Sequence, residues 1–211
     1  GDVSDEALPF LAVRTIDVGT ALAVVGRISL TGELGYEIVV PAIRHRTLWH
    51  ELREAGEPRG LRPVGDRAID SLRLEKGYGI WSTEFRQDVT PAESGLDRYV
   101  AYDAKDFVGA DAARRERDTG PSRRLVLLDV DAADADASRD DGIWIGERLV
   151  GVVTSGAYGH HVGSSLALAY ADVDAIETGA DLTVTVLGDP RPARILPEAP
   201  YDPKGQRLRD A

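Results

Sequence analysis

Glu37 is the ionisable residue whose position raises the clearest chemical question. It lies between Tyr36 and Ile38 in the stretch TGELGYEIVVP, residues 31–41, which has the pattern of a turn followed by a short strand. Because strand side chains alternate between the two faces of a sheet, Glu37 shares its face with Val39. Tyr36 and Ile38 share the opposite face. Both faces are largely apolar, so we expect a buried strand.

A carboxylate on a buried strand needs a partner, because an unpaired charge away from water is costly. One interpretation is an ion pair with an arginine of the same chain, such as Arg67 or Arg73. The other is a ligand that donates two parallel N–H bonds to the two carboxylate oxygens. The residues alone leave both open.

A second candidate region is the irregular segment YGIWSTEFRQDVTPAESGL, residues 78–96. Loops of this length inside compact domains are often functional. Trp81 either stacks on a ligand or caps the core, whereas Tyr78 is more typical of a core residue. Glu84 lies in the same loop.

His160 and His161 suggest a metal site only at first sight. Adjacent residues in an extended segment point in opposite directions, and no third ligand follows at a characteristic spacing. We therefore predict no metal site. The chain has no Cys, which excludes thiolate catalysis and disulfides, and it shows no serine nucleophile elbow or Walker loop. The sequence leaves the catalytic residues unknown.

Composition excludes further classes of function. The net charge of −11 argues against a nucleic-acid-binding surface, which needs a basic stripe. No run approaches the roughly 18 apolar residues of a membrane-spanning helix, and no signal-peptide layout is visible. We expect a cytoplasmic chain. Since its first residue is Gly1 rather than Met, we also expect that it was processed or cut from something longer.

The first part of the chain is predicted to be α/β. Residues 21–30 and 36–40 form a hairpin around the Gly-containing turn 31–35, and helices follow at 42–56 and 66–77. A strand at 97–103 and a short helix around 108–118 come after the long loop. Residues 129–142 are acidic, which is typical of a solvated connector.

From Arg123 onward the pattern is a series of short β-runs with turn signals between them, which indicates a small barrel or sandwich. These runs are residues 124–130, 143–155 as a hairpin, 165–171, 182–188 and 193–198. We place the domain boundary in the turn at 119–122. The predicted fold class is α+β, with one domain over 1–120 and a C-terminal domain over 121–211.

Five ordered motifs resemble the aminomethyltransferase family, the T-protein of the glycine cleavage system with its fused relatives. The motifs are TGELGYEI, DSLRLEKGY, TPAESGLDRYV, DFVGADA and VGVVTSGAYGHHVGSSLALAY. In these motifs the sequence most resembles the C-terminal folate-binding region of dimethylglycine and sarcosine dehydrogenases. The resemblance implies a partial folate-binding domain followed by a small antiparallel β-barrel. It also implies a packing or pocket-rim role for the HisHis turn.

The resemblance implies that the cofactor is tetrahydrofolate and that Glu37 binds its pterin ring. Tyr36, Trp81, Arg98 and Tyr99 are the other expected cofactor-binding residues. The neighbourhood departs from the family pattern, because Leu30 replaces an expected Tyr, Ile69 an Arg and Ser82 a Gly. At Arg98 the family usually has an aromatic residue. These changes fit either a folate pocket with altered contacts or a pocket for another ligand.

The implied activity is one-carbon transfer to tetrahydrofolate in the breakdown of glycine or methylated amines. The family's catalytic Asp lies in an N-terminal half that would precede Gly1, so we expect the chain alone to be catalytically incomplete. Any FAD would lie on a flavin dehydrogenase domain or subunit that partners this chain. Two alternatives are a non-catalytic folate- or ligand-binding module docked on that dehydrogenase, and a folate-dependent demethylase. An iron–sulfur assembly role is weak, because Tyr78 follows Lys76-Gly77 where that relative has Cys.

Overall fold

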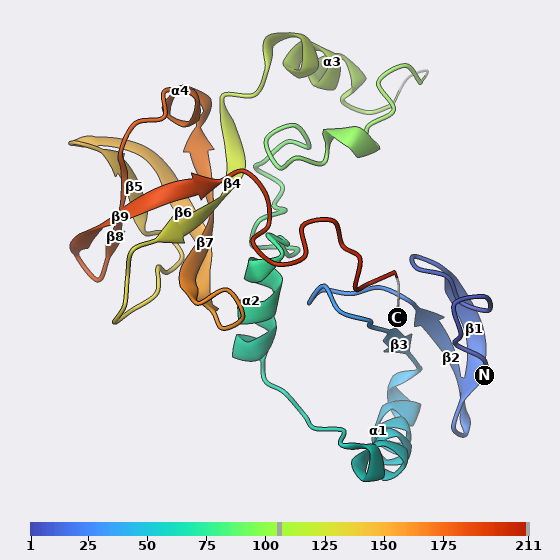
Figure 1. Ribbon diagram of the computed structural model, residues 1–211. Coiled ribbons are helices and arrows are strands. Elements are labelled where there is room, and N and C mark those ends of the chain that lie inside the picture. The colour runs from blue at the N-terminus through green and yellow to red at the C-terminus, as the bar shows by residue number, and fades with distance from the viewer. Residues whose placement is uncertain (105–106, 210–211) are drawn as a thin grey trace. The chain divides into compact units, whose positions relative to one another are not determined.

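A computed structural model describes residues 1–104 and 107–209 of the chain (Figure 1). The chain forms two compact units. The first contains Gly1–Leu72 and the C-terminal segment from Asp202, and the second contains Arg73–Tyr201. No helix in the described ranges has the length and apolar character needed to cross a membrane. The domain boundary at 120/121 stays a prediction.

The first unit is built on a three-stranded antiparallel sheet in the order β1-β2-β3. Its strands are β1 (Val13–Val18), β2 (Ala21–Gly26) and β3 (Glu37–Val39). Leu8 and alternate residues of β2 are buried on one face, where Tyr36 and Ile38 also pack. The predicted pairing of residues 21–30 with 36–40 is confirmed by the register of β2 with β3.

The connection between β2 and β3 is longer than the predicted turn. After Gly26 the backbone of Arg27 bonds to Leu11 and Ala12 instead of to the β3 side. The buried Arg27 guanidinium also pairs with Asp5, which holds the chain away from β3. β1 was not predicted, although Gly19 forms the turn between β1 and β2 with a φ of +56°.

The predicted helices are confirmed. α1 (Ala42–Gly56) has the predicted bounds, and α2 (Asp66–Glu75) ends two residues early, before Gly77. A short 3-10 helix, η1 (Glu57–Arg59), follows α1, and α3 (Ala110–Thr119) lies where the third helix was expected.

The predicted strand at 97–103 is wrong. Its first residues form the 3-10 helix η2 (Asp97–Tyr99), in which the Tyr99 N–H donates to the Leu96 carbonyl. This i→i+3 bond turns the chain tightly, so the backbone is not free to pair as a strand.

The second half of the chain is a closed antiparallel barrel in the order β4-β7-β6-β5-β8-β9, which confirms the predicted α+β class (Figure 1). Its elements are β4 (Arg123–Val130), β5 (Gly142–Ile145), β6 (Arg148–Gly159), β7 (Ser164–Asp172), β8 (Leu182–Val186) and β9 (Asp189–Leu196). The short helix α4 (Val173–Glu177) between β7 and β8 was not predicted.

The barrel is apolar on its inside and on part of its outside. Leu128 and Ile143 belong to the interior cluster, and both are fully buried. Leu166 and Leu168 of β7 form a second cluster with Leu74 of α2. Because Leu74 packs on this outer patch, Leu166 and Leu168 are buried although they lie outside the interior cluster.

The acidic segment 129–142 is more than a solvated connector. Ala137 is 2% exposed and packs in the barrel interior. Asp136 accepts a 2.7 Å hydrogen bond from Ser165, and Asp134 pairs with Arg191. Its acidic composition predicted solvation, but these contacts fix part of the segment to the barrel.

Candidate functional site

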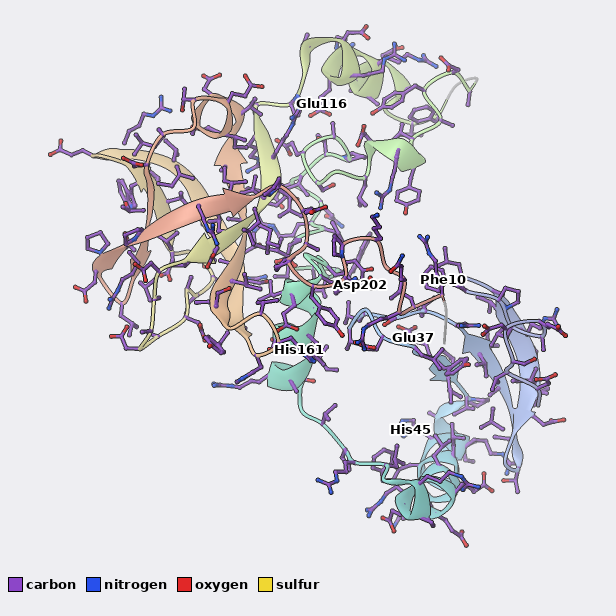
Figure 2. The ribbon with its side chains drawn as sticks, viewed as in Figure 1. Phe10, Glu37, His45, Glu116, His161 and Asp202 are labelled. Carbon is purple, nitrogen blue, oxygen red and sulfur yellow. The ribbon has the colours of Figure 1, made fainter. Side chains whose placement is uncertain are left out.

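Glu37, labelled in Figure 2, is the first residue of β3 and is exposed. Its cross-strand neighbour is Gly26, which has no side chain to meet it. Among the residues that the structure describes, no hydrogen bond or ion pair engages the Glu37 carboxylate. The expected buried strand is therefore wrong, since Val39 on the same face is 60% exposed. The alternation of faces was right, but nothing in this unit covers the Glu37 face.

The proposed arginine partners of Glu37 do not pair with it. Arg73 is buried and lies 3.4 Å from Glu84, measured from Nη1 to Oε2. Arg67 is exposed and makes no ion pair with Glu37 among the described residues. Since neither arginine pairs with Glu37, the interpretation that Glu37 binds a ligand remains.

Tyr36 lies on the opposite face of the sheet from Glu37. Its ring packs against the buried cluster of the first unit, which includes Leu8 and Val25. Its hydroxyl donates to the carbonyl oxygen of Val3 at 3.0 Å. The structure therefore does not bring Tyr36 and Glu37 to the same surface.

Trp81 is 81% exposed, so it does not cap the core. It lies in a tight turn in which Glu84 and Phe85 donate backbone N–H groups to the Ile80 carbonyl. Trp81 and Phe85 line a pocket of about 540 Å³, whose other apolar walls are Val89, Pro91 and Leu96. The arrangement presents an aromatic, partly apolar surface to a ligand or a partner.

Arg98 and Tyr99 lie together in η2, just beyond the last pocket residue, Leu96. The Arg98 guanidinium sits 4.9 Å from the centroid of the Tyr99 ring. Tyr99 is 74% exposed, so its ring remains available for contact. The structure thus brings these two predicted residues side by side on an exposed turn.

Glu84 fixes the turn that carries Trp81, and sequence reasoning missed this role. Its side chain is fully buried. Oε2 accepts from the Ile80 N–H at 2.9 Å, and Oε1 accepts from the Ser155 hydroxyl at 2.5 Å. The Tyr170 hydroxyl donates to the Glu84 carbonyl at 3.0 Å. Since Ser155 is 71 residues away along the chain, no local pattern reveals the partnership.

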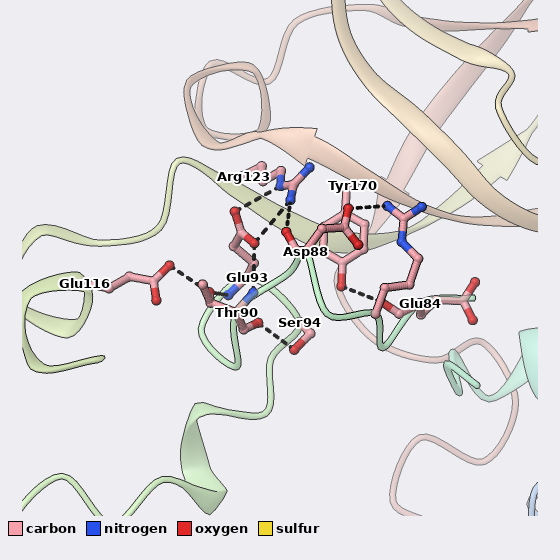
Figure 3. A network of polar contacts seen from close by, with 9 residues as sticks. Glu84, Asp88, Thr90, Glu93, Ser94, Glu116, Arg123 and Tyr170 are labelled. Atoms are coloured by element: carbon pink, nitrogen blue, oxygen red, sulfur yellow. Dashed lines mark hydrogen bonds and ion pairs between the residues drawn. The ribbon is translucent and has the colours of Figure 1, made fainter. Parts of the chain in front are cut away.

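Glu93 fixes the following part of the loop (Figure 3). It accepts from the Thr90 N–H at 2.9 Å while its own N–H donates to Thr90 Oγ1 at 3.1 Å. The Thr90-x-x-Glu93 spacing is the capping-box pattern, so the sequence did carry a signal for this pair. Arg123 Nε donates to Glu93 Oε1 at 2.9 Å, and this bond raises the pKa of Arg123. Thr90 also donates to Glu116 at 2.7 Å.

Tyr170 lies beneath this network, and Arg123 sits 5.3 Å from its ring centroid (Figure 3). Burial raises the pKa of Tyr170 to about 12, and the negative charge of Glu93 acts in the same direction. The phenol therefore stays protonated and keeps its hydrogen bond to Glu84.

Glu75 joins the end of α2 to the turn between β6 and β7. Oε1 accepts from the backbone N–H groups of His161 and Val162 at 2.6 and 3.3 Å. His161 Nδ1 lies 3.3 Å from Oε2, and the His161 ring packs on Tyr201. These contacts pack the turn between β6 and β7 against Glu75 and Tyr201, which is a packing role of the kind expected for His160 and His161. The described residues contain no cluster of three or more potential metal ligands.

The chain matches two family models. The first, described as the GCVT N-terminal domain, matches residues 1–104. The second, the glycine cleavage T-protein C-terminal barrel domain, matches residues 123–202.

Relatives and solved structures agree with these matches. The chain is 36% identical to mouse (Mus musculus) dimethylglycine dehydrogenase, over 93% of this chain and 23% of that protein. It is 37% identical to an aminomethyltransferase of Corynebacterium aurimucosum, over 89% of this chain and 51% of that protein. The crystal structure of aminomethyltransferase T from Bartonella henselae matches 98% of this chain and 55% of its own, with a TM-score of 0.79 and 27% identity. The chain thus spans only about a quarter to about half of these proteins.

Replacing Glu84 by Gln keeps the shape of the side chain and removes the charge that faces Arg73. We expect the free energy of unfolding to fall by about 1.5–3 kcal/mol, the usual contribution of a hydrogen bond to a charged group. Urea denaturation measures this loss. The exposed turn residue Glu147 provides the control, and Glu147→Gln should change the free energy by less than about 0.5 kcal/mol. Equal changes in the two variants would contradict the anchoring role of Glu84.

The raised pKa of Tyr170 predicts a loss of stability in alkali. An unfolded tyrosine titrates near 10 and folded Tyr170 near 12, so the folded state holds its proton where the unfolded state has lost it. This contribution is fully present below pH ~10 and is lost as pH rises from about 10 to about 12. Denaturation at a series of pH values should show a shallower alkaline fall for Tyr170→Phe than for the wild type. If the curves of the wild type and Tyr170→Phe fell in parallel above pH ~10, the raised pKa of Tyr170 would be contradicted.

Proposed function

Because this chain belongs to the glycine cleavage T-protein (aminomethyltransferase) family, we propose that it binds tetrahydrofolate in one-carbon transfer from an amine. It would act as part of a longer enzyme. The observation that carries the proposal is the exposed Glu37 carboxylate, which has no partner among the described residues of its unit.

The surroundings of Glu37 fit a pterin. Two carboxylate oxygens match the two N–H donors of the 2-aminopyrimidinone edge, a geometry that a charged acceptor strengthens. Val39 shares the face of Glu37, and Val24 lies directly opposite Val39 on β2. Both valines are exposed and offer apolar contact to a flat ring.

The remaining predicted cofactor contacts stay proposals. Trp81 and Tyr99 present exposed rings, which supports stacking on an aromatic part of the ligand. Arg98 supplies a cation suited to a carboxylate of the folate tail. Tyr36 would act indirectly, because its core packing sets the orientation of the strand that carries Glu37.

Tetrahydrofolate, when bound, would supply the ring nitrogen that takes up the one-carbon unit. The contribution of this chain would be to bind and orient it, since correct positioning alone lowers a barrier substantially. The three buried glutamates of the second unit, Glu75, Glu84 and Glu93, already accept structural hydrogen bonds. We therefore assign none of them as the general base, and we propose that the acid–base group comes from another part of the enzyme.

The amine donor is proposed to be glycine-derived or methylated. Support comes from relatives such as dimethylglycine dehydrogenase and the sarcosine oxidase subunit alpha of Rhizobium meliloti, of which the chain spans 23% and 22%. In such an enzyme a flavin dehydrogenase domain or subunit with FAD would generate the one-carbon donor. If the chain binds folate without supporting transfer when the whole enzyme is assembled, the non-catalytic module is the better description.

Replacing Glu37 by Gln tests the proposal. The amide keeps one acceptor but loses the charge, so we expect tetrahydrofolate to bind roughly 10- to 100-fold more weakly, equivalent to the 1.5–3 kcal/mol of a charge-assisted bond. Isothermal titration calorimetry on the full chain measures both affinities.

Glu147→Gln is the matched control, because Glu147 is an exposed acid in the β5–β6 turn of the barrel. Its affinity should equal that of the wild type. Absence of tetrahydrofolate binding to the wild type would overturn the cofactor proposal. Equal binding by wild type and Glu37→Gln would remove Glu37 from the site.

A further inference from the structure

A small pocket in the second unit gathers three arginines from separate parts of the chain, and we call it the arginine pocket. Arg86 comes from the loop that carries Trp81, Arg123 begins β4, and Arg139 lies in the acidic segment 129–142. The volume of the pocket is about 340 Å³. Small-molecule sites occupy roughly 300–1,000 Å³, so the pocket suits a ligand at the small end of that range.

Arg86 and Arg123 are held in position by acids that do not line the arginine pocket. Arg123 Nε donates to Glu93 at 2.9 Å, and its Nη2 donates to the Asp88 carbonyl at 2.8 Å (Figure 3). Arg86 Nη2 lies 3.1 Å from the Asp88 carboxylate. In the ranges that the structure covers, the Nη1 group of each arginine makes no hydrogen bond. These donors are therefore available to a ligand, and the existing contacts already restrict the side chains that carry them.

Arg139 is exposed, and no described residue forms an ion pair or hydrogen bond with its guanidinium. The backbone beside it is nonetheless fixed to β6, because the Asp140 N–H donates to the Val153 carbonyl and the Val153 N–H donates to the Asp141 carbonyl, both at 2.9 Å. Three cations that line one pocket repel one another. An anion bound among them would remove this repulsion, so the arrangement favours a negatively charged ligand.

The acids that line the arginine pocket limit the charge of that ligand. Asp140 and Asp172 are both exposed, and within the described ranges neither carboxylate has a bonded partner. Tyr170 also lines the pocket and adds no charge near neutral pH, because burial raises its pKa to about 12. Since two carboxylates would repel a polyanion such as a nucleotide, we expect the ligand to carry a single negative charge.

The remaining wall of the arginine pocket is apolar. Leu149 and Val152 of β6 line it, and they are 50% and 38% exposed. Burial of this aliphatic surface favours a ligand that has an apolar group. A carboxylate suits the arginines, because its two oxygens match the paired N–H donors of a guanidinium.

We propose that the arginine pocket binds a small monocarboxylate that has an aliphatic body. The carboxylate lies against the three arginines, and the body lies against Leu149 and Val152. Glu37, Trp81 and Tyr99, the residues proposed for folate, do not line this pocket. The two proposals can therefore fail separately.

Binding of cyclohexanecarboxylate to the full chain tests the proposal, and saturation-transfer NMR measures its affinity. This probe joins one carboxylate to an aliphatic ring. Cyclohexanecarboxamide is the neutral match, and it should bind roughly tenfold more weakly or worse because it lacks the charge. Acetate and inorganic phosphate are added as competitors. Both should displace the probe only when they are in excess over it, since neither buries an aliphatic ring.

Two neighbouring substitutions should shift the affinity in opposite directions. Arg139→Gln removes a cation and should weaken binding by roughly three- to fivefold, whereas Asp140→Asn removes a repelling charge and should strengthen it by roughly two- to threefold. Asn also tolerates the φ of +71° at residue 140. Arg46→Gln and Glu54→Gln make the same charge changes at exposed residues of α1 and should leave the affinity unchanged. Circular dichroism and thermal unfolding check that each variant folds.

The proposal is overturned if the wild type shows no saturable binding of the probe, or if the carboxamide binds as tightly as the carboxylate. It is also overturned if Arg139→Gln and Asp140→Asn change the affinity no more than the two α1 controls do. Displacement of the probe by phosphate at a lower concentration than that of the probe would assign the pocket to a phosphate-bearing ligand and contradict the monocarboxylate.

Discussion

The shape of the loop that carries Trp81 depends on one constraint. A buried carboxylate is stable only when hydrogen-bond donors contact its oxygens. Glu84 meets it with the Ile80 N–H, the Ser155 hydroxyl and the nearby Arg73 guanidinium. Glu93 meets it with Thr90 and Arg123. Because each acid joins the loop to the barrel, the loop keeps a defined shape without regular secondary structure of its own.

Glu37 is also a glutamate, but unlike Glu84 and Glu93 it is exposed to solvent. Its carboxylate is exposed and has no partner among the described residues, so its charge remains available. Burial and partners therefore separate Glu84 and Glu93, which hold the loop in place, from the exposed Glu37, for which we propose a ligand.

Much of the fold follows from patterns in the sequence, because short-range alternation and helical spacing decide which residues form strands and helices. The barrel strands and α1 were predictable for this reason. The exposure of the Glu37 face of β3 was not predictable. Alternation assigns side chains to the two faces of a strand, but it does not say whether another layer covers a face. The strand predicted at 97–103 was wrong because a local i→i+3 turn forms at its start, despite the strand-like composition of the segment.

The candidate site was predictable in part. The position of Glu37 between two apolar residues identified it as unusual, and the motif resemblance supplied the pterin interpretation. The loop anchors were missed where the partners are distant in sequence, as with Glu84 and Ser155, which are 71 residues apart. Only the Thr90-x-x-Glu93 spacing offered a local signal.

A double-mutant cycle tests the central claim most directly, because it isolates the contact between Glu37 and the pterin edge from all other effects. The affinities of wild type and Glu37→Gln are measured for tetrahydrofolate and for its analogue that lacks the 2-amino group. If Glu37 binds that group, removing it weakens binding to the wild type by roughly tenfold or more and has little effect on Glu37→Gln. An equal loss of affinity in both proteins would contradict the account.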